Sequence, residues 1–122
     1  RIRHYFQSLI FNQSEHPVVF QIKEYIRQNF AVPTLSVLDI SQYANRSSSY
    51  ICTLFKNETG QTINQYLTDY RIKMSKQFLS DPRYRITDIS AKVGYSDGNY
   101  FGKSFRKYSG LSPSEYREKN LK

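Results

Sequence analysis

Few side chains in this sequence could do covalent or metal chemistry, and they are poorly placed for it. Cys52 is the only thiol, and the two histidines, His4 and His16, both lie near the amino-terminal end. A structural metal needs several ligands at short, regular spacings, and a nucleophile needs a base to activate it. We therefore expect no enzyme activity, no metal and no cofactor. The unpaired cysteine also favours a reducing, cytoplasmic setting.

Positive charge is the chemistry that remains, and it is concentrated in the second half of the chain. There are 18 Lys and Arg residues against 10 Asp and Glu residues, a net charge of +8. From Ile63 onward there are 12 basic and 6 acidic residues, a net charge of +6, which leaves +2 for the first 62 residues. Polyanions are the natural partners of such a chain. A membrane span is excluded, because no segment approaches the roughly 20 apolar residues that a bilayer requires.

The elements that would position these cations are helices, because apolar residues recur at spacings of three and four and no segment alternates with period two. We expect an all-α fold of about seven helices, at residues 17–32, 37–44, 48–59, 63–80, 86–93 and 99–108 and from 113 onward. Ser36 is a candidate N-cap, and Ser112 and Glu115 form a capping box. The residues expected on the buried faces are Leu38, Ile40, Ala44, Leu54, Phe55, Tyr66, Ile89, Val93, Tyr100, Phe101, Phe105 and Tyr116.

The chain contains an internal repeat. Asp39-Ile40-Ser41 matches Asp88-Ile89-Ser90 at an offset of 49 residues. At an offset of 50, four further matches follow in order: Tyr50 with Tyr100, Phe55 with Phe105, Gly60 with Gly110 and Tyr66 with Tyr116. The change in offset predicts a one-residue insertion in the turn between the two short helices of the second copy. A short helix, a tight turn and a second helix make a helix-turn-helix, and in DNA-binding versions the second helix enters the major groove.

These residues resemble the AraC/XylS-type transcriptional regulators. The segment Ile86–Arg117 is similar to the signature of that family, with Gly94-Tyr95, Tyr100-Phe101, Phe105, Gly110, Ser112-Pro113 and Tyr116-Arg117 in register. Tyr50–Ile72 is similar to the segment that precedes the signature, and the resemblance covers about residues 18–118. It implies two homeodomain-like helix-turn-helix subdomains joined by a long linker helix, acting as the sequence-specific, double-stranded DNA-binding domain of a bacterial transcription regulator. Ser41, Ser75 and Ser90 stand where the family usually has alanine.

The repeat and the resemblance divide the chain into a first subdomain at residues 16–61, a linker helix at 62–80 and a second subdomain at 81–122. The linker helix would be about 27 Å long at about 1.5 Å per residue, and successive major-groove faces lie about 34 Å apart. The second helices of the two copies could then bind in adjacent major grooves. Residues 1–15 are expected to be a linker or tail of a missing upstream domain. The resemblance implies that the upstream domain is a sensing or receiver domain. RNA polymerase is a further candidate partner.

The candidate base contacts lie early on the second helix of each repeat. By resemblance these positions face DNA, and they are Ser48, Ser49, Cys52 and Thr53 in the first copy and Gly98, Asn99, Gly102 and Lys103 in the second. Serine and threonine hydroxyls bond several bases, so the first helix is expected to discriminate weakly. Asn99 could pair with adenine, and Lys103 could reach guanine O6 and N7. The two glycines would remove side-chain bulk from the face that approaches the DNA.

The candidate phosphate contacts are Lys56, Arg106 and Lys107, which come later on the same helices. These cations could instead be solvated residues that suit the negative end of a helix dipole. Asn99 could instead satisfy the start of its helix, and Cys52 could be a partly buried filler or a redox sensor. A helical protein-interaction module whose basic face meets an acidic partner stays open as the alternative function.

Overall fold

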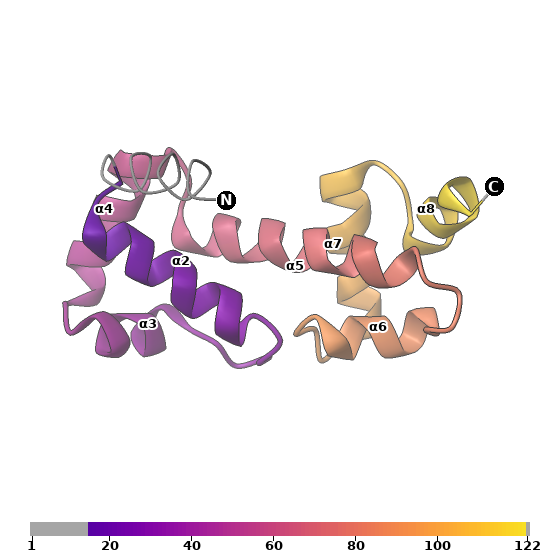
Figure 1. Ribbon diagram of the computed structural model, residues 1–122, viewed down its shortest axis with the longest axis horizontal. Coiled ribbons are helices and arrows are strands. Elements are labelled where there is room, and N and C mark those ends of the chain that lie inside the picture. Colours follow the sequence, from indigo (N-terminus) through magenta and orange to yellow (C-terminus); the bar gives the residue numbers. More distant parts are fainter. Residues whose placement is uncertain (1–14, 122) are drawn as a thin grey trace, which may run out of the picture. The chain divides into compact units, whose positions relative to one another are not determined.

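The computed structural model describes residues 15–121, and this part of the chain forms seven α-helices and no strand. The helices are α2 (Pro17–Asn29), α3 (Val37–Ala44), α4 (Ser48–Thr59), α5 (Ile63–Leu79), α6 (Ile86–Lys92), α7 (Gly98–Ser109) and α8 (Pro113–Asn120) (Figure 1). The all-α prediction is confirmed. The tail predicted at residues 1–15 falls almost wholly on residues 1–14, which lie outside the described residues. No helix in the described range is long and apolar enough to cross a membrane.

The described residues form two compact units. One unit holds residues 15–28 and Ser36–Ile63, and so contains nearly all of α2 together with α3 and α4. The other holds Asn29–Leu35 and the chain from Asn64 onward, with most of α5 and all of α6, α7 and α8. Each unit contains one copy of the repeat, and each copy is a helix-turn-helix.

The two copies end in the same way. Phe55 and Phe105 are fully buried at equivalent places on α4 and α7. Gly60 and Gly110 follow these helices in the left-handed region, at φ values of 81° and 83°. Each glycine N–H donates to the carbonyl oxygen four residues earlier, at 2.9 and 2.8 Å. Glycine adopts this conformation without the penalty that a Cβ brings, which explains why both helices stop there.

The turns inside the two copies differ by one residue, as the change in offset predicts. The left-handed residues after the first helices are Asn45, at φ 57°, and Gly94, at φ 93°, which lie 49 positions apart. The N-caps of the second helices are Ser47 and Asp97, which lie 50 positions apart, and the side chain of each accepts a hydrogen bond from a backbone N–H of the first turn. The inserted residue therefore lies between the left-handed residue and the N-cap.

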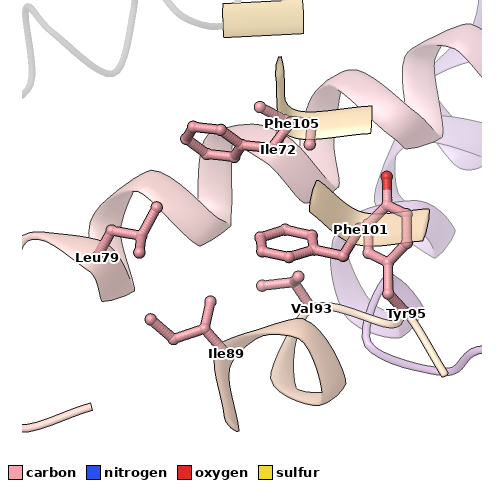
Figure 2. Packing of buried hydrophobic residues seen from close by; sticks show 7 residues of the cluster. All are labelled: Ile72, Leu79, Ile89, Val93, Tyr95, Phe101 and Phe105. Atoms are coloured by element: carbon pink, nitrogen blue, oxygen red, sulfur yellow. The ribbon is translucent and has the colours of Figure 1, made fainter. Parts of the chain in front are cut away.

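Seven buried side chains of the second unit pack together between α5, α6 and α7. Figure 2 shows Ile72 and Leu79 of α5 directed towards Ile89 of α6 and towards the turn and α7 residues Val93, Tyr95, Phe101 and Phe105. Tyr116 of α8 is partly buried, and its ring meets that of Phe105 edge-on at 5.5 Å between centroids. The first unit buries Ile22, Ile26, Ile40, Ile51 and Phe55 completely or almost completely. The predicted core residues Ile40, Ala44, Phe55, Ile89, Val93, Phe101 and Phe105 are thus confirmed.

Two residues that the sequence placed on buried faces are exposed, and those predictions are wrong. Leu38 is 59% exposed and Tyr100 is 62% exposed. At about 100° per residue, Leu38 lies on the opposite side of α3 from the buried Ile40, and Tyr100 is turned well away from both Phe101 and Phe105. Leu54 is only partly buried. Spacings of three and four alone did not separate these positions from the core face.

The three serines at which the sequence departs from the family that it resembles are buried, and each hydroxyl has a hydrogen-bond partner. Ser41, Ser75 and Ser90 are 4%, 0% and 7% exposed. Each hydroxyl donates to the backbone carbonyl oxygen three residues earlier, at 2.8, 2.7 and 3.2 Å. A buried hydroxyl without a partner would cost free energy of folding, and these local bonds remove that cost.

Arg71 holds the segment Asn29–Leu35 within the second unit. Its Nε donates to the carbonyl oxygen of Phe30 and its Nη2 to that of Val32, both at 2.9 Å. The guanidinium carbon also lies 5.8 Å from the centroid of the Tyr95 ring. Burial lowers the pKa of Arg71, but the ordinary value is so high that the group stays charged at neutral pH. The segment is therefore fixed by two charge-assisted hydrogen bonds.

Candidate nucleic-acid interface

The predicted base-contact residues of α4 lie away from the core of their unit. Ile51 and Phe55 direct the buried face of this helix inward. Ser49, Cys52 and Thr53 are exposed, and Ser48 is half-buried at the first helical position. The exposure of Cys52 excludes the alternative that it is a partly buried filler. The outward face of α4 thus carries hydroxyls and one thiol, with little charge.

Of the predicted base-contact residues of α7, Asn99 and Lys103 lie on the side opposite the buried Phe101 and Phe105, whereas Gly98 and Gly102 lie on one flank of the helix. Gly98, Asn99 and Lys103 are exposed, and Gly102 is partly exposed. The start of this helix is capped by Asp97, whose Oδ1 accepts a hydrogen bond of 2.9 Å from the backbone N–H of Asn99. The side-chain amide of Asn99 is therefore not needed to cap the helix, and it remains directed to solvent.

Neither glycine of α7 is required by packing. A Cβ built on Gly102 would meet no atom within 4 Å, and one built on Gly98 would meet only the Ser90 hydroxyl, at 3.9 Å. Glycine inside a helix costs roughly 0.5–1 kcal/mol relative to alanine. The two glycines therefore lower the stability of α7, although packing inside the domain does not require them.

A hollow of about 410 Å³ adjoins these glycines. It is lined by residues of α6, α7 and α8 and of the turn before α7, namely Ile86, Thr87, Ser90, Asp97, Gly98, Asn99, Phe101, Gly102, Pro113 and Ser114. A side chain at position 102 would project towards this hollow. The two glycines thus keep one flank of α7 concave.

The three predicted phosphate contacts differ in their present partners. The Nζ of Lys56 donates to the carbonyl oxygen of Gly60 at 3.1 Å, across the end of its own helix. The Nη1 of Arg106 lies 3.3 Å from Oε1 of Glu115. The ammonium group of Lys107 has no ion pair or hydrogen bond with any residue in the described part of the chain. Lys56 thus fits the helix-end alternative in this state, while Lys107 is available to a partner.

The carboxylate of Glu115 is ionised at neutral pH and serves two purposes. The backbone N–H of Ser112, which donates to it at 2.8 Å, and the nearby Arg106 hold the pKa of this carboxyl below its ordinary value. Together with the Ser112 hydroxyl it forms the predicted capping box of α8. Both side chains of the pair with Arg106 are more than half exposed, so this ion pair can be exchanged at little cost.

The second helices of the two copies, α4 and α7, differ in charge. Besides its Lys56, α4 carries the acidic Glu58, whereas α7 carries Lys103, Arg106 and Lys107 and no acidic residue. No group of three or more His, Cys, Asp or Glu side chains that could hold a metal occurs among residues 15–121. The chemistry of α7 is therefore that of a cationic helix suited to an anionic partner.

Tyr50 and Tyr100 are exposed tyrosines of these helices that the sequence did not single out as candidate site residues. They are equivalent in the repeat, and they are 44% and 62% exposed. The guanidinium carbon of Arg46 lies 5.9 Å from the centroid of the Tyr50 ring. An aromatic residue on an apolar periodicity is usually buried, so the sequence offered no signal that these two face solvent.

Comparison with known proteins places this arrangement in a family. The chain is 36% identical over 107 residues to the Msm operon regulatory protein of Streptococcus mutans, covering 88% of the chain and 38% of that protein. It is 38% identical over 111 residues to the transcriptional regulatory protein HptR of Staphylococcus aureus, covering 91% of the chain and 43% of that protein. The chain thus spans about two fifths of the length of these curated relatives.

Solved structures agree with these relatives. The chain superposes on the C-terminal domain of AraT, a response regulator from Geobacillus stearothermophilus, with a TM-score of 0.85, 28% identity and coverage of 88% of both chains. A family model described as a helix-turn-helix domain matches residues 40–119, which include the whole second copy of the repeat and all but the start of the first. These relatives are transcription regulators, not enzymes. The chain belongs to the AraC/XylS-type family of helix-turn-helix DNA-binding domains.

Proposed function

We propose that this chain reads double-stranded DNA sequence-specifically for a bacterial transcription regulator, with α4 and α7 addressing adjacent major grooves. The observation that carries the proposal is the chemistry of the solvent-facing sides of these helices. Hydroxyl, thiol, amide and ammonium groups are exposed there, while the apolar sides are buried. Major-groove base edges carry the donors and acceptors that such groups bind.

The proposed base contacts fall into a weakly discriminating set and a selective set. Ser48, Ser49, Cys52 and Thr53 on α4 form the first, because small hydroxyls bond several bases. On α7, Asn99 pairs with adenine and Lys103 with guanine, while Gly98 and Gly102 let the backbone approach. The role of Asn99 is supported by the cap that Asp97 supplies instead.

The proposed phosphate contacts are Lys56, Arg106 and Lys107. Lys107 is exposed and ready to bind a phosphate. Lys56 and Arg106 would exchange their present partners, the carbonyl oxygen of Gly60 and the carboxylate of Glu115, for phosphate oxygens. Such contacts fix the register of the protein on the duplex without reading sequence.

For the whole protein we propose a cytoplasmic activator that joins this domain to a sensing or receiver domain and contacts RNA polymerase. The greater length of the regulatory proteins to which the chain is similar supports a further domain. The single cysteine, Cys52, supports a reducing compartment.

Selection of bound sites from random duplex DNA tests the function directly. The expected result is one asymmetric site with two boxes about one helical turn, or roughly 34 Å, apart. The absence of any enriched sequence would contradict sequence-specific reading by either helix. The selected duplex and a scrambled version of it then serve as the cognate and non-cognate DNA in the measurements below.

Lys103→Ala is expected to weaken binding to the cognate duplex more than binding to the scrambled one, because it removes a base contact worth about 1–3 kcal/mol. Arg106→Ala is expected to weaken both equally and to reduce the slope of log affinity against log salt by about one unit, because it removes a phosphate contact. Fluorescence anisotropy over a salt series measures both effects. Equal losses on the two duplexes for Lys103→Ala would remove its base-contact role.

A further inference from the structure

A second hollow lies within the second unit, between α5 and α7. Its volume is about 180 Å³, and it is lined by Thr68, Tyr100, Lys103, Ser104, Lys107 and Tyr108. Four of these side chains carry hydroxyl groups, two carry ammonium groups, and none is a carboxylate. Every lining side chain can therefore donate a hydrogen bond, and the charge of the lining is +2. This is the chemistry of a site for an oxyanion.

The donors of this hollow are only partly used inside the domain. The Ser104 hydroxyl interacts with that of Tyr95, and it offsets part of the rise in the Tyr95 pKa that burial causes. Tyr100 and Tyr108 are 62% and 40% exposed, although both are large aromatic side chains. The ring of Tyr100 lies 5.7 Å from that of Tyr95, which restricts its position without burying it. Neither tyrosine hydroxyl, nor the ammonium group of Lys107, has a hydrogen bond to another residue in the described range.

The internal repeat shows that the fold does not require this chemistry. At an offset of 50, the first copy has Thr53, Asn57 and Glu58 where the second has Lys103, Lys107 and Tyr108. The first copy therefore has no ammonium group at these positions, and it has a carboxylate. The ammonium groups at these positions are therefore particular to the second copy.

The hollow adjoins the proposed base-reading face of α7. Lys103 lies one helical turn after Asn99, and Lys107 lies one turn after Lys103. The major groove is about 12 Å wide, close to the diameter of a helix with its side chains. A helix seated there must bring its flanks near the phosphates of both strands. The flank with Gly98 and Gly102 is concave, and the opposite flank carries the donors of this hollow.

We propose that Thr68, Tyr100, Lys107 and Tyr108 of this hollow bind a phosphate group, most simply a backbone phosphate of the duplex that α7 reads. Lys107 supplies the charge, and the three hydroxyls supply neutral hydrogen bonds that fix the phosphate oxygens. The DNA-backbone source rests on the proposed function, whereas the phosphate site itself does not.

Titration of the chain with inorganic phosphate tests the site without DNA. Saturable amide chemical-shift changes are expected at Thr68, Tyr100, Lys107 and Tyr108. They should be lost in Lys107→Gln and retained in Lys119→Gln, which removes the same charge from an exposed position of α8. Shifts of equal size around exposed lysines everywhere, or none at the hollow, would overturn the proposal.

DNA binding then identifies the source of the phosphate. Tyr100→Phe removes only a hydroxyl, and it should weaken binding to cognate and scrambled duplexes alike by about three- to tenfold, with the salt slope unchanged. Lys107→Gln should reduce that slope by about one unit. Tyr43→Phe, which removes the hydroxyl of an exposed tyrosine in the other unit, is the matched control.

The two measurements separate the possible failures. Phosphate shifts at the hollow together with unchanged DNA affinity in Tyr100→Phe would support the site and assign it to a free phosphate group. A lack of sequence preference in all duplexes would refute the proposed function, while the phosphate titration would still decide the hollow.

Discussion

Replacing Gly102 with leucine is expected to weaken binding to the cognate duplex by at least about tenfold while the domain stays folded. Disrupting the contact to one base pair in a protein–DNA interface typically costs about 1–3 kcal/mol of binding free energy. A tenfold loss of affinity corresponds to about 1.4 kcal/mol. The fold should survive, because a Cβ at this position meets no atom within 4 Å. Leucine is also a far better helix former than glycine. The side chain would instead occupy the space in which we propose that DNA approaches α7.

Urea unfolding followed by circular dichroism, together with anisotropy on the cognate duplex, measures the two effects separately. Gly102→Ala is the graded control, and it should raise the free energy of unfolding by about 0.5–1 kcal/mol. Its smaller side chain should weaken binding less than leucine does. Undiminished affinity in Gly102→Leu would show that this flank of α7 does not approach the DNA.

Replacing Gly94 with alanine is expected to lower the free energy of unfolding by about 3 kcal/mol or more. Gly94 has a φ of +93°, and its Cβ would lie 2.4 Å from the carbonyl oxygen of Phe30 and 2.7 Å from Nε of Arg71. The new atom would push apart the hydrogen bond by which Arg71 holds the segment Asn29–Leu35. A shift of either neighbour alone would lengthen that bond.

Gly60→Ala separates the backbone effect from the packing effect at Gly94. Gly60 has a similar φ of +81°, but a Cβ there would meet no atom within 4 Å. Its replacement should cost only the left-handed strain, about 1–2 kcal/mol. Urea unfolding of both variants gives the comparison. Equal losses at the two positions would mean that the contact with Phe30 and Arg71 contributes nothing.

Much of the fold could be predicted from the sequence because the responsible interactions are local. The N-cap Ser36, the capping box of Ser112 and Glu115, and the glycines at 60 and 110 act within one helical turn of the helix ends that they set. Residues this close in sequence meet in any conformation that forms the helix at all. The same holds for the repeat and for its one-residue insertion.

The candidate site was predictable as a set of positions and less so as a set of contacts. The spacing of residues along α4 and α7 placed the proposed base contacts on exposed faces, because a helix fixes which residues share a side. It could not assign Arg106 to Glu115, nor Lys56 to the carbonyl oxygen of Gly60. Those partners depend on how the chain turns after each helix.

The sequence by itself determined the helices, the duplicated helix-turn-helix and the excess positive charge of the second half of the chain, since each follows from composition and short-range spacing. Only the tertiary structure decided that Tyr100 faces solvent, that Arg71 holds Asn29–Leu35, and that donors of α5 and α7 converge in one hollow. Helical periodicity says which residues lie on one face. Which face is covered, and by what, is decided by the packing of segments that can be some 40 residues apart, as Phe30 and Arg71 are.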